Sequence, residues 1–264
     1  MPAALRAALL LILAGCLYLF LAPPYWFPAG ASMQAIFIDH QFKVALWVLG
    51  AMFIAGHLVL AFVLWKKPRT DGKASRGNSW LEIAWTVAVT VIFFWLHVSG
   101  NHPFAHMKMS TRLISQPEIE VTGAQFQWYF RYPGADGVFG RTDVQKFAKA
   151  DEGNPLGIDP ADPYGRDDIL SSSLVVPVGQ PVVLRLKAQD VIHSLFIPAM
   201  RVKQDTVPGI EIHSHFTPTQ IGTYEIVCSQ LCGTGHYKMR AVVRVVSEEE
   251  FQQWLTAQKK SSRE

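Results

Sequence analysis

Apolar runs near the start of the chain limit its folding more than any other feature of the sequence. Residues 44–65 contain a single ionisable side chain, His57, and residues 81–98 form a second apolar run with tryptophans near its ends. A helix over the first run would be about 33 Å long, which matches the hydrocarbon core of a bilayer. The sequence therefore predicts a transmembrane hairpin over residues 40–100, with helices at about 44–65 and 81–98.

The linker between the two runs is basic and reads KKPRTDGKASRGNSW. It contains Lys and Arg at five positions and one acid, Asp71. Short loops rich in Lys and Arg remain in the cytoplasm, so we expect everything after residue 100 to lie outside. In a bacterium, this orientation predicts a multi-pass protein of the inner membrane with a large periplasmic domain.

A shorter apolar run, residues 7–22, follows Arg6. Its length is typical of a signal-peptide core rather than of a spanning helix. The stretch Leu13-Ala14-Gly15-Cys16 also has the pattern of a lipoprotein cleavage site, although the residues after Cys16 stay apolar. We therefore expect residues 1–22 to be a signal peptide or an N-terminal anchor. Cleavage near Ala22, lipidation of Cys16 and an uncleaved anchor remain as alternatives.

Residues 103–246 have a different pattern, in which short β-type runs alternate with turn residues. These runs are rich in Val and aromatic residues and read IEVTGAQFQWYFRY, SLVVPVGQPVVLRLKA, IGTYEIVCS and MRAVVRVVS. The spacing predicts an all-β sandwich or barrel. Residues 247–264 are expected to form a short helix and tail, because Ser247 and Glu250 make a capping box before an amphipathic stripe.

Charge and cysteine content narrow the classes of function. The formal net charge is only +3, which gives no support to a nucleic-acid partner. Three cysteines do not make a disulfide scaffold, and two of them lie in the stretch CSQLCGTGHYKM, residues 228–239. That stretch is therefore the main candidate for a functional site.

Several kinds of site use two cysteines at this spacing. A disulfide would account for Cys228 and Cys232 but not for His236 and Met239 at the following intervals. Methionine is a poor zinc ligand, and a mononuclear blue-copper site uses one cysteine rather than two. Two thiolates, a thioether and two imidazoles suit a pair of copper ions. The second imidazole must come from elsewhere, and the candidates outside the cytoplasm are His102, His106, His193, His213 and His215.

The neighbours of His193 distinguish it from the other histidines. The element Asp190-Val191-Ile192-His193-Ser194 places His193 35 residues before Cys228. With the cysteine stretch and the hairpin, this element resembles subunit II of the haem–copper cytochrome c oxidases over roughly residues 40–256. The resemblance implies a membrane-anchored all-β protein, in which a two-helix transmembrane hairpin precedes a cupredoxin-like β-sandwich and a short C-terminal helix.

The function implied by the resemblance is electron transfer within an oxidase. Subunit II of that family accepts electrons from cytochrome c at a dinuclear copper centre. It passes them to the haem–copper centre of subunit I, which reduces oxygen to water with proton pumping. The implied partners are subunits I and III, cytochrome c or another haem c donor, and the membrane. No Cys-x-x-Cys-His haem attachment sequence is present, so no haem is expected in this chain.

Carried over residue by residue, the resemblance implies one set of ligands for the two copper ions. The sixth ligand is the main-chain carbonyl of Gln230, where the family usually has Glu. The carboxylate of that Glu reaches a magnesium ion at the boundary with subunit I, and Gln lacks its charge. Asp205 matches the family's other acid near this magnesium. The remaining copper ligands are His193, Cys228, Cys232, His236 and Met239.

Two further residues take roles from the same resemblance. Trp128, in QWYFRY, matches the tryptophan that receives the electron from cytochrome c, although residues of such a run also alternate into a sheet core. Glu82, in LEIAWT, matches an acid at the entrance of a proton path into subunit I. An acid at this helix end could instead lie simply in the headgroup layer.

Acidic side chains are concentrated in one insert, residues 151–168. A solvated loop, a docking surface for a basic cytochrome c and a calcium site are the three interpretations of this segment.

Three other classes share part of the pattern. Nitrous oxide reductase has a similar copper motif, but without a hairpin directly before the sandwich. Quinol-oxidase subunits II lack the copper ligands. A thioredoxin-type copper-delivery protein would have Pro at the position of Gly233.

Overall fold

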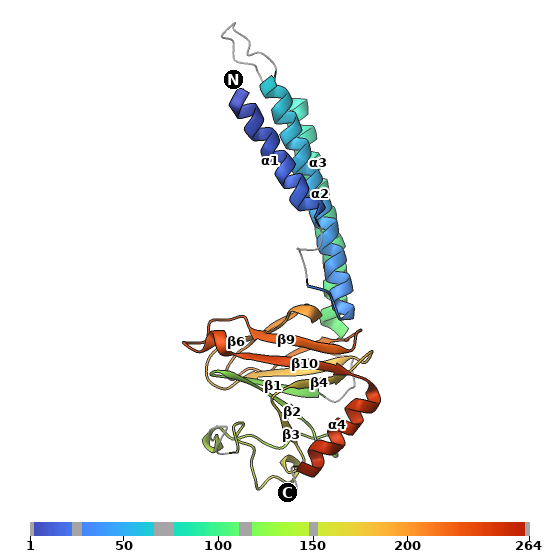
Figure 1. Cartoon of the computed structure of the whole chain (residues 1–264). Helices are drawn as coiled ribbons and strands as arrows, with labels where there is room; N and C mark the ends of the chain where they lie inside the picture. Colours follow the sequence, from blue (N-terminus) through green and yellow to red (C-terminus); the bar gives the residue numbers. More distant parts are fainter. Residues whose placement is uncertain (1–2, 23–27, 66–76, 111–117, 148–152, 262–264) are drawn as a thin grey trace. The chain divides into compact units, whose positions relative to one another are not determined.

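The computed structural model describes residues 3–22, 28–65, 77–110, 118–147 and 153–261. They form two compact units, one helical and one dominated by β-strands (Figure 1). The helical unit is drawn from residues 1–28 and 37–105, and the β unit from residues 29–36 and 106–264.

The helical unit contains α1 (Ala3–Leu21) and most of α2 (Met33–Trp65) and α3 (Ser79–Ser110). Two stretches are long and apolar enough to cross a membrane, Met33–Val63 and Ser79–Asn101. Both helices extend beyond the predicted 44–65 and 81–98. Hydropathy alone misses the start of α2, because Asp39, His40 and Lys43 interrupt the apolar pattern without breaking a helix.

Two five-stranded sheets make up the β unit, which confirms the predicted sandwich. Both sheets are mixed, since β1 pairs with β5 in parallel and β10 with β4 in parallel. The first sheet has the order β3 (Ile169–Ser171), β2 (Gln127–Tyr132), β1 (Glu118–Ala124), β5 (Val182–Ala188), β8 (Ile212–Phe216). The second has the order β4 (Leu174–Pro177), β10 (Arg240–Val246), β9 (Gly222–Cys228), β6 (His193–Ile197), β7 (Val202–Thr206).

The core lies between the two sheets and follows the alternation of the strands. Alternate side chains of each sheet point inward, and a fully buried side chain of this size contributes about 1.5–3 kcal/mol. Large residues that are almost completely buried are Trp128, Phe130, Leu184, Leu186, Leu195, Ile197, Phe216 and Ile226.

The segment between β2 and β3 carries the acidic insert, and its described acids are engaged within the fold. Asp168 pairs with the guanidinium of Arg131, which is only 1% exposed and also contacts Glu120 at 3.3 Å. Asp159 pairs with Lys146, and Asp162 accepts a hydrogen bond from the Nε of Arg141 at 3.3 Å. Of the insert's acids, Asp151 and Glu152 lie outside the described residues. Much of the local negative charge is therefore compensated by cations within the fold.

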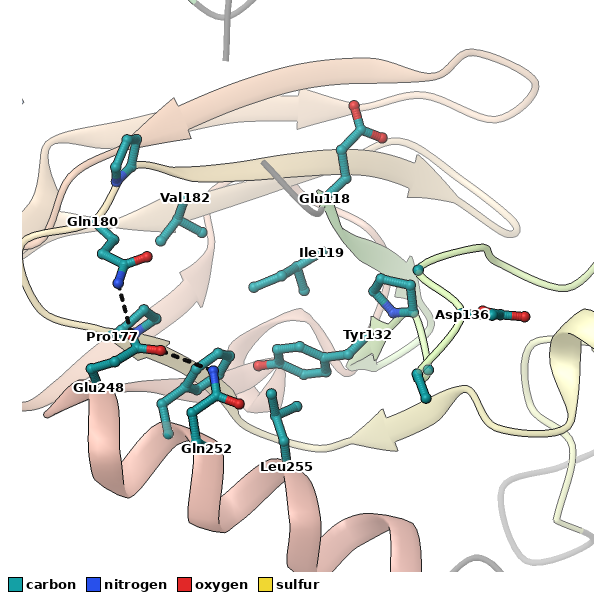
Figure 2. Close-up of a pocket in the computed structure, with 16 residues that line it drawn as sticks. Glu118, Ile119, Tyr132, Asp136, Pro177, Gln180, Val182, Glu248, Gln252 and Leu255 are labelled. Carbon is teal, nitrogen blue, oxygen red and sulfur yellow. Dashed lines mark hydrogen bonds between the residues drawn. The ribbon is translucent and has the colours of Figure 1, made fainter. Parts of the chain in front are cut away.

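Helix α4 (Glu248–Ser261) begins at the predicted capping box. Ser247 Oγ accepts a hydrogen bond from Glu250 N at 3.2 Å, and Glu250 Oε2 accepts one from Ser247 N at 3.0 Å. The helix borders a cavity of about 390 Å³ at one end of the sandwich (Figure 2). Figure 2 shows Tyr132 and Ile119 lining it from the sandwich side.

The short segment 29–36 belongs to the β unit although it precedes both predicted membrane helices. Ala31 N donates to Ala199 O at 2.8 Å, and Thr219 N donates to Ala31 O at 2.8 Å. Ser32 Oγ donates to Met200 O at 2.7 Å. A fragment that begins at residue 103 would lose these bonds, so experiments on the sandwich should use the full chain.

Candidate metal centre

The candidate ligands come from two neighbouring strands and the loop that follows one of them. His193 opens β6, and Cys228 ends β9. These strands are antiparallel neighbours with Leu195 opposite Cys228, so the two side chains meet at one end of the second sheet. Cys232, His236 and Met239 follow in the loop before β10. Strand order therefore brings together residues that are 35 positions apart.

The sulfur of Cys232 lies at the centre of the cluster. It is 4.0 Å from Cys228 Sγ, 3.5 Å from His236 Nδ1 and 3.8 Å from Met239 Sδ. Metal–sulfur bonds are about 2.3 Å long, so one ion can bind both cysteines at this separation. Both cysteines are free thiols, and their separation is about twice the length of a disulfide bond. The geometry therefore favours a metal site over a disulfide.

The imidazole of His193 is oriented as a metal ligand would be. The ring is completely buried, and its Nε2 lies 2.8 Å from Asp190 Oδ1. An ionised carboxylate only accepts hydrogen bonds, so Nε2 carries the proton and Nδ1 keeps a free lone pair. Nδ1 has no hydrogen-bond partner among the described residues. Since buried polar atoms are rarely left unpaired, a ligand for Nδ1 is expected here.

In the described part of the chain, only one group of three His, Cys, Asp or Glu side chains is placed so that it could hold a metal ion. This group consists of His193, Cys228 and Cys232. Their three ligand atoms lie within 4.8 Å of one another, and all three residues are buried. Of the other candidate histidines, His213 and His215 lie on β8 in the first sheet, and the Nε2 of His213 is 3.2 Å from Glu118 Oε1. The side chains of His102 and His106 lie outside the described residues.

Two charge effects shape the site. Partial burial opposes ionisation of Asp190, but hydrogen bonds from His193, Gln125 N and Val191 N outweigh it and lower the pKa of this carboxyl. Burial, together with the neighbouring thiol of Cys228, raises the pKa of Cys232 to about 11. A metal ion that binds Cys232 would therefore have to replace its proton.

The remaining predicted site residues occupy different positions. Gln230 is an exposed residue whose carbonyl oxygen accepts a hydrogen bond from Cys228 Sγ at 3.2 Å, which places this carbonyl at the cluster. Asp205 is exposed on β7, opposite Ser194, the residue after His193. Glu82 lies in the first turn of α3, in the helical unit, and is exposed.

Trp128 lies beside the cluster but below the surface. Its side chain is only 1% exposed, and its ring packs edge-on against His193 with centroids 6.0 Å apart. Gly123 permits this contact, because a Cβ there would approach both rings at 3.0 Å. Trp128 is thus a core residue in contact with a candidate ligand, as the alternation of β2 allows.

The ligand loop rests on the ring of Phe126, in the turn between β1 and β2. A Cβ at Gly235 would lie only 2.3 Å from Phe126 Cδ2. We therefore expect Gly235→Ala to force a shift of the loop or the ring and to cost about 1–3 kcal/mol. Thermal unfolding of the full chain in detergent measures this effect. A Phe126→Leu change in the same variant should recover part of the loss, whereas strictly additive effects would contradict the predicted contact.

Two residues near the cluster, Gln125 and Phe126, carry no signal in the sequence alone. Gln125 and Phe126 approach the ligand loop from a turn more than 100 positions earlier, a contact that no local pattern encodes. Asp190 belongs to the element Asp190-Val191-Ile192-His193-Ser194. The spacing of three residues between Asp190 and His193 is its only local signal, and the hydrogen bond to the ring gives it a role.

Comparisons with known proteins agree on one family. A family model described as cytochrome C oxidase subunit II, periplasmic domain, matches residues 118–246. The chain is 32% identical over 270 residues to the alternative cytochrome c oxidase subunit 2 of Bradyrhizobium diazoefficiens, covering 97% of this chain and 92% of the relative. It is 30% identical over 240 residues to cytochrome c oxidase subunit 2 of Cereibacter sphaeroides, covering 87% of this chain and 78% of the relative.

A solved structure is also similar. The crystal structure of the periplasmic domain of subunit II of cytochrome oxidase from Bradyrhizobium japonicum aligns with 30% sequence identity and a TM-score of 0.41. The alignment covers 56% of this chain and 96% of that chain.

Proposed function

Because this chain belongs to the cytochrome c oxidase subunit II family, we propose that it is the electron-accepting subunit of a haem–copper oxidase and holds two copper ions. It would accept electrons from cytochrome c, or another haem c donor, and pass them to the haem–copper centre of subunit I. Oxygen reduction and proton pumping would take place in that partner.

The convergence of six donor groups on one cluster carries this proposal. The ligand set is two thiols, two imidazoles, a thioether and the carbonyl of Gln230, and the thiols and His193 are buried. Soft sulfur and imidazole ligands are those that copper prefers. The Nδ1 of His193, which has no hydrogen-bond partner among the described residues, adds one more metal-binding atom.

Copper would supply one-electron redox chemistry at this site, and the protein's part is to keep the ligands still. His193 is held by Asp190 at 2.8 Å, and Met239 is only 1% exposed. Cys228 N donates to Met239 O at 3.2 Å, so the backbone joins the two ends of the ligand loop. Buried, mutually fixed ligands such as these would move little when the charge changes, and the burial of His193, Cys228, Cys232 and Met239 would limit the access of water to the metal.

The position of Trp128 bears on how an electron would arrive. Its ring touches His193 but is only 1% exposed, so a donor cannot stack directly on it. We propose that the donor docks on the surface above this ring and that Trp128 bridges the remaining distance to His193. Leu231 and Tyr237, next to the ligands and 78% and 70% exposed, offer apolar surface for a partner protein.

The membrane part and the accessory residues complete the proposal. The two long apolar helices would cross the inner membrane as a hairpin, with the sandwich in the periplasm and subunits I and III beside them. Glu82 would mark the start of a proton path into subunit I. Asp205 would lie beside a magnesium ion at that boundary, a site to which Gln230 contributes no charge.

Copper content and electron paramagnetic resonance (EPR) test this function directly. Full-length protein in detergent, loaded with copper, should contain two ions per chain with one unpaired electron shared between two copper nuclei. Met239→Leu should retain both ions but shift the reduction potential, since it removes only the thioether. A single copper with the hyperfine pattern of one nucleus, or zinc in place of copper, would refute the proposal.

A further inference from the structure

The turn between β1 and β2 reaches both halves of the metal cluster. β1 ends at Ala124 and β2 begins at Gln127, so the turn consists of Gln125 and Phe126. It contacts the segment before His193 and also the loop after Cys228. These contacts adjoin the two parts of the chain that supply the proposed ligands, His193 on β6 and residues 228–239, which are far apart in the sequence.

The first contact runs through the backbone of Gln125. Its N–H donates to Asp190 Oδ2 at 2.7 Å, while Asp190 Oδ1 lies 2.8 Å from His193 Nε2. The carboxylate therefore binds the turn with one oxygen and the imidazole with the other. Any shift of Gln125 would be transmitted to the ring of His193 through this carboxylate.

The second contact runs through the side chain of the same residue. Gln125 Nε2 donates to Cys232 O at 2.6 Å. A carbonyl only accepts hydrogen bonds, so this contact requires the amide nitrogen and could not be made by a carboxylate. It fixes the backbone of the residue whose sulfur lies at the centre of the cluster.

We propose that Gln125 is a positioning residue that sets the separation between the imidazole of His193 and the thiolate of Cys232 in the copper site. Its backbone fixes one ligand segment, and its amide fixes the other. This inference rests on the proposed copper function, because it concerns the ligands of that centre.

Tight packing around the turn holds the side-chain amide of Gln125 against the ligand loop. Both side chains of the turn pack tightly against the ligand loop. A Cβ at Gly233 would lie 2.9 Å from Gln125 Nε2 and 3.0 Å from Phe126 Cε1. Trp128 follows three residues later on β2 and touches His193 from the side of the same hairpin. The same hairpin therefore contacts both ligand segments and also carries Trp128, the proposed electron-accepting residue.

Gln125→Leu removes the amide but preserves the backbone N–H and much of the side-chain volume. Gln127→Leu is the matched control, because Gln127 is an exposed glutamine two positions later in the same hairpin. Copper-loaded, full-length variants in detergent would be compared by EPR, reduction potential and the rate of copper loss to an excess of a copper chelator. Loss of an outer contact of this kind typically weakens metal binding about 10- to 100-fold.

We expect Gln125→Leu to lose copper at least about tenfold faster than wild type, with a changed hyperfine pattern and a shifted potential. Gln127→Leu should match wild type in all three measurements. Gln125→Glu, which keeps the shape but offers an acceptor instead of a donor, should resemble Gln125→Leu. Wild-type copper loss and spectrum in both Gln125 variants would overturn the inference.

The two proposals fail in different ways. If wild-type protein does not hold two copper ions, the proposed function is wrong. If wild type holds them and Gln125→Leu is indistinguishable from it, only the positioning role is wrong. Thermal unfolding of the copper-free variants separates positioning from folding, since a purely structural role would lower stability without altering the spectrum or potential of the protein that remains loaded.

Discussion

Replacing Cys232 by serine is expected to destroy the proposed two-copper centre. The sulfur of Cys232 lies within 4.0 Å of the donor atoms of Cys228, His236 and Met239, so its loss removes a thiolate that could connect three other ligands. A serine hydroxyl stays protonated at neutral pH and lacks the soft character that copper prefers. We expect copper per chain to fall from two to at most one, measured by metal analysis together with EPR.

Cys16→Ser is the matched control for this change. Cys16 is the only other cysteine and lies in α1, in the helical unit rather than in the sandwich. The control variant should retain both copper ions and the wild-type spectrum. Two ions with an unchanged spectrum in Cys232→Ser would contradict the central position of this sulfur.

Replacing Arg131 by methionine is expected to give the largest loss of stability. Arg131 is 1% exposed, and it pairs with Glu120 at 3.3 Å, with Asp168, and with Gly140 O at 2.5 Å. Methionine has a similar length but leaves the buried carboxylate of Asp168 without its cation, whereas Glu120 keeps Lys187 at 2.8 Å and Arg185 at 3.2 Å. Breaking a buried ion pair from one side costs about 3–5 kcal/mol. Thermal unfolding should show a fall on the order of 10 °C for a unit of this size.

Arg141→Met is the matched control, because it removes an exposed arginine that also pairs with acids of the insert. The side chain of Arg141 is 77% exposed, although it too pairs with acids of the insert, Asp159 and Asp162. Exposed ion pairs contribute about 0–1 kcal/mol, so this variant should unfold close to the wild-type temperature. Equal losses in the two variants would show that burial does not decide the strength of these pairs.

The described acids of the insert show where prediction from local sequence stops. Their number is visible in the sequence, and it suggested docking or calcium binding as well as a solvated loop. The structure pairs Asp159 and Asp168 with cations of the same unit. Whether an acid is free or paired depends on residues that approach it from other parts of the fold, such as Arg131 on β2.

The burial of Trp128 is a second property that the local sequence could not predict. The run QWYFRY predicts a strand of alternating faces, and the structure confirms that Trp128 and Phe130 face the core. Which side of the strand is covered depends on the second sheet, and so the burial of a tryptophan expected to meet a donor could not be read from the run itself.

The sequence by itself determined the presence of two long apolar helices, the strand-rich class of the second unit and the chemical types of the proposed ligands. Each of these depends on composition and short spacing, which local chemistry governs. Only the tertiary structure decided that β6 and β9 are neighbours, and hence that the ring of His193 meets the thiols of Cys228 and Cys232. Strand order also brought Gln125 against Cys232, 107 positions away. Such contacts arise from the packing of whole sheets, for which a stretch of a few residues carries no information.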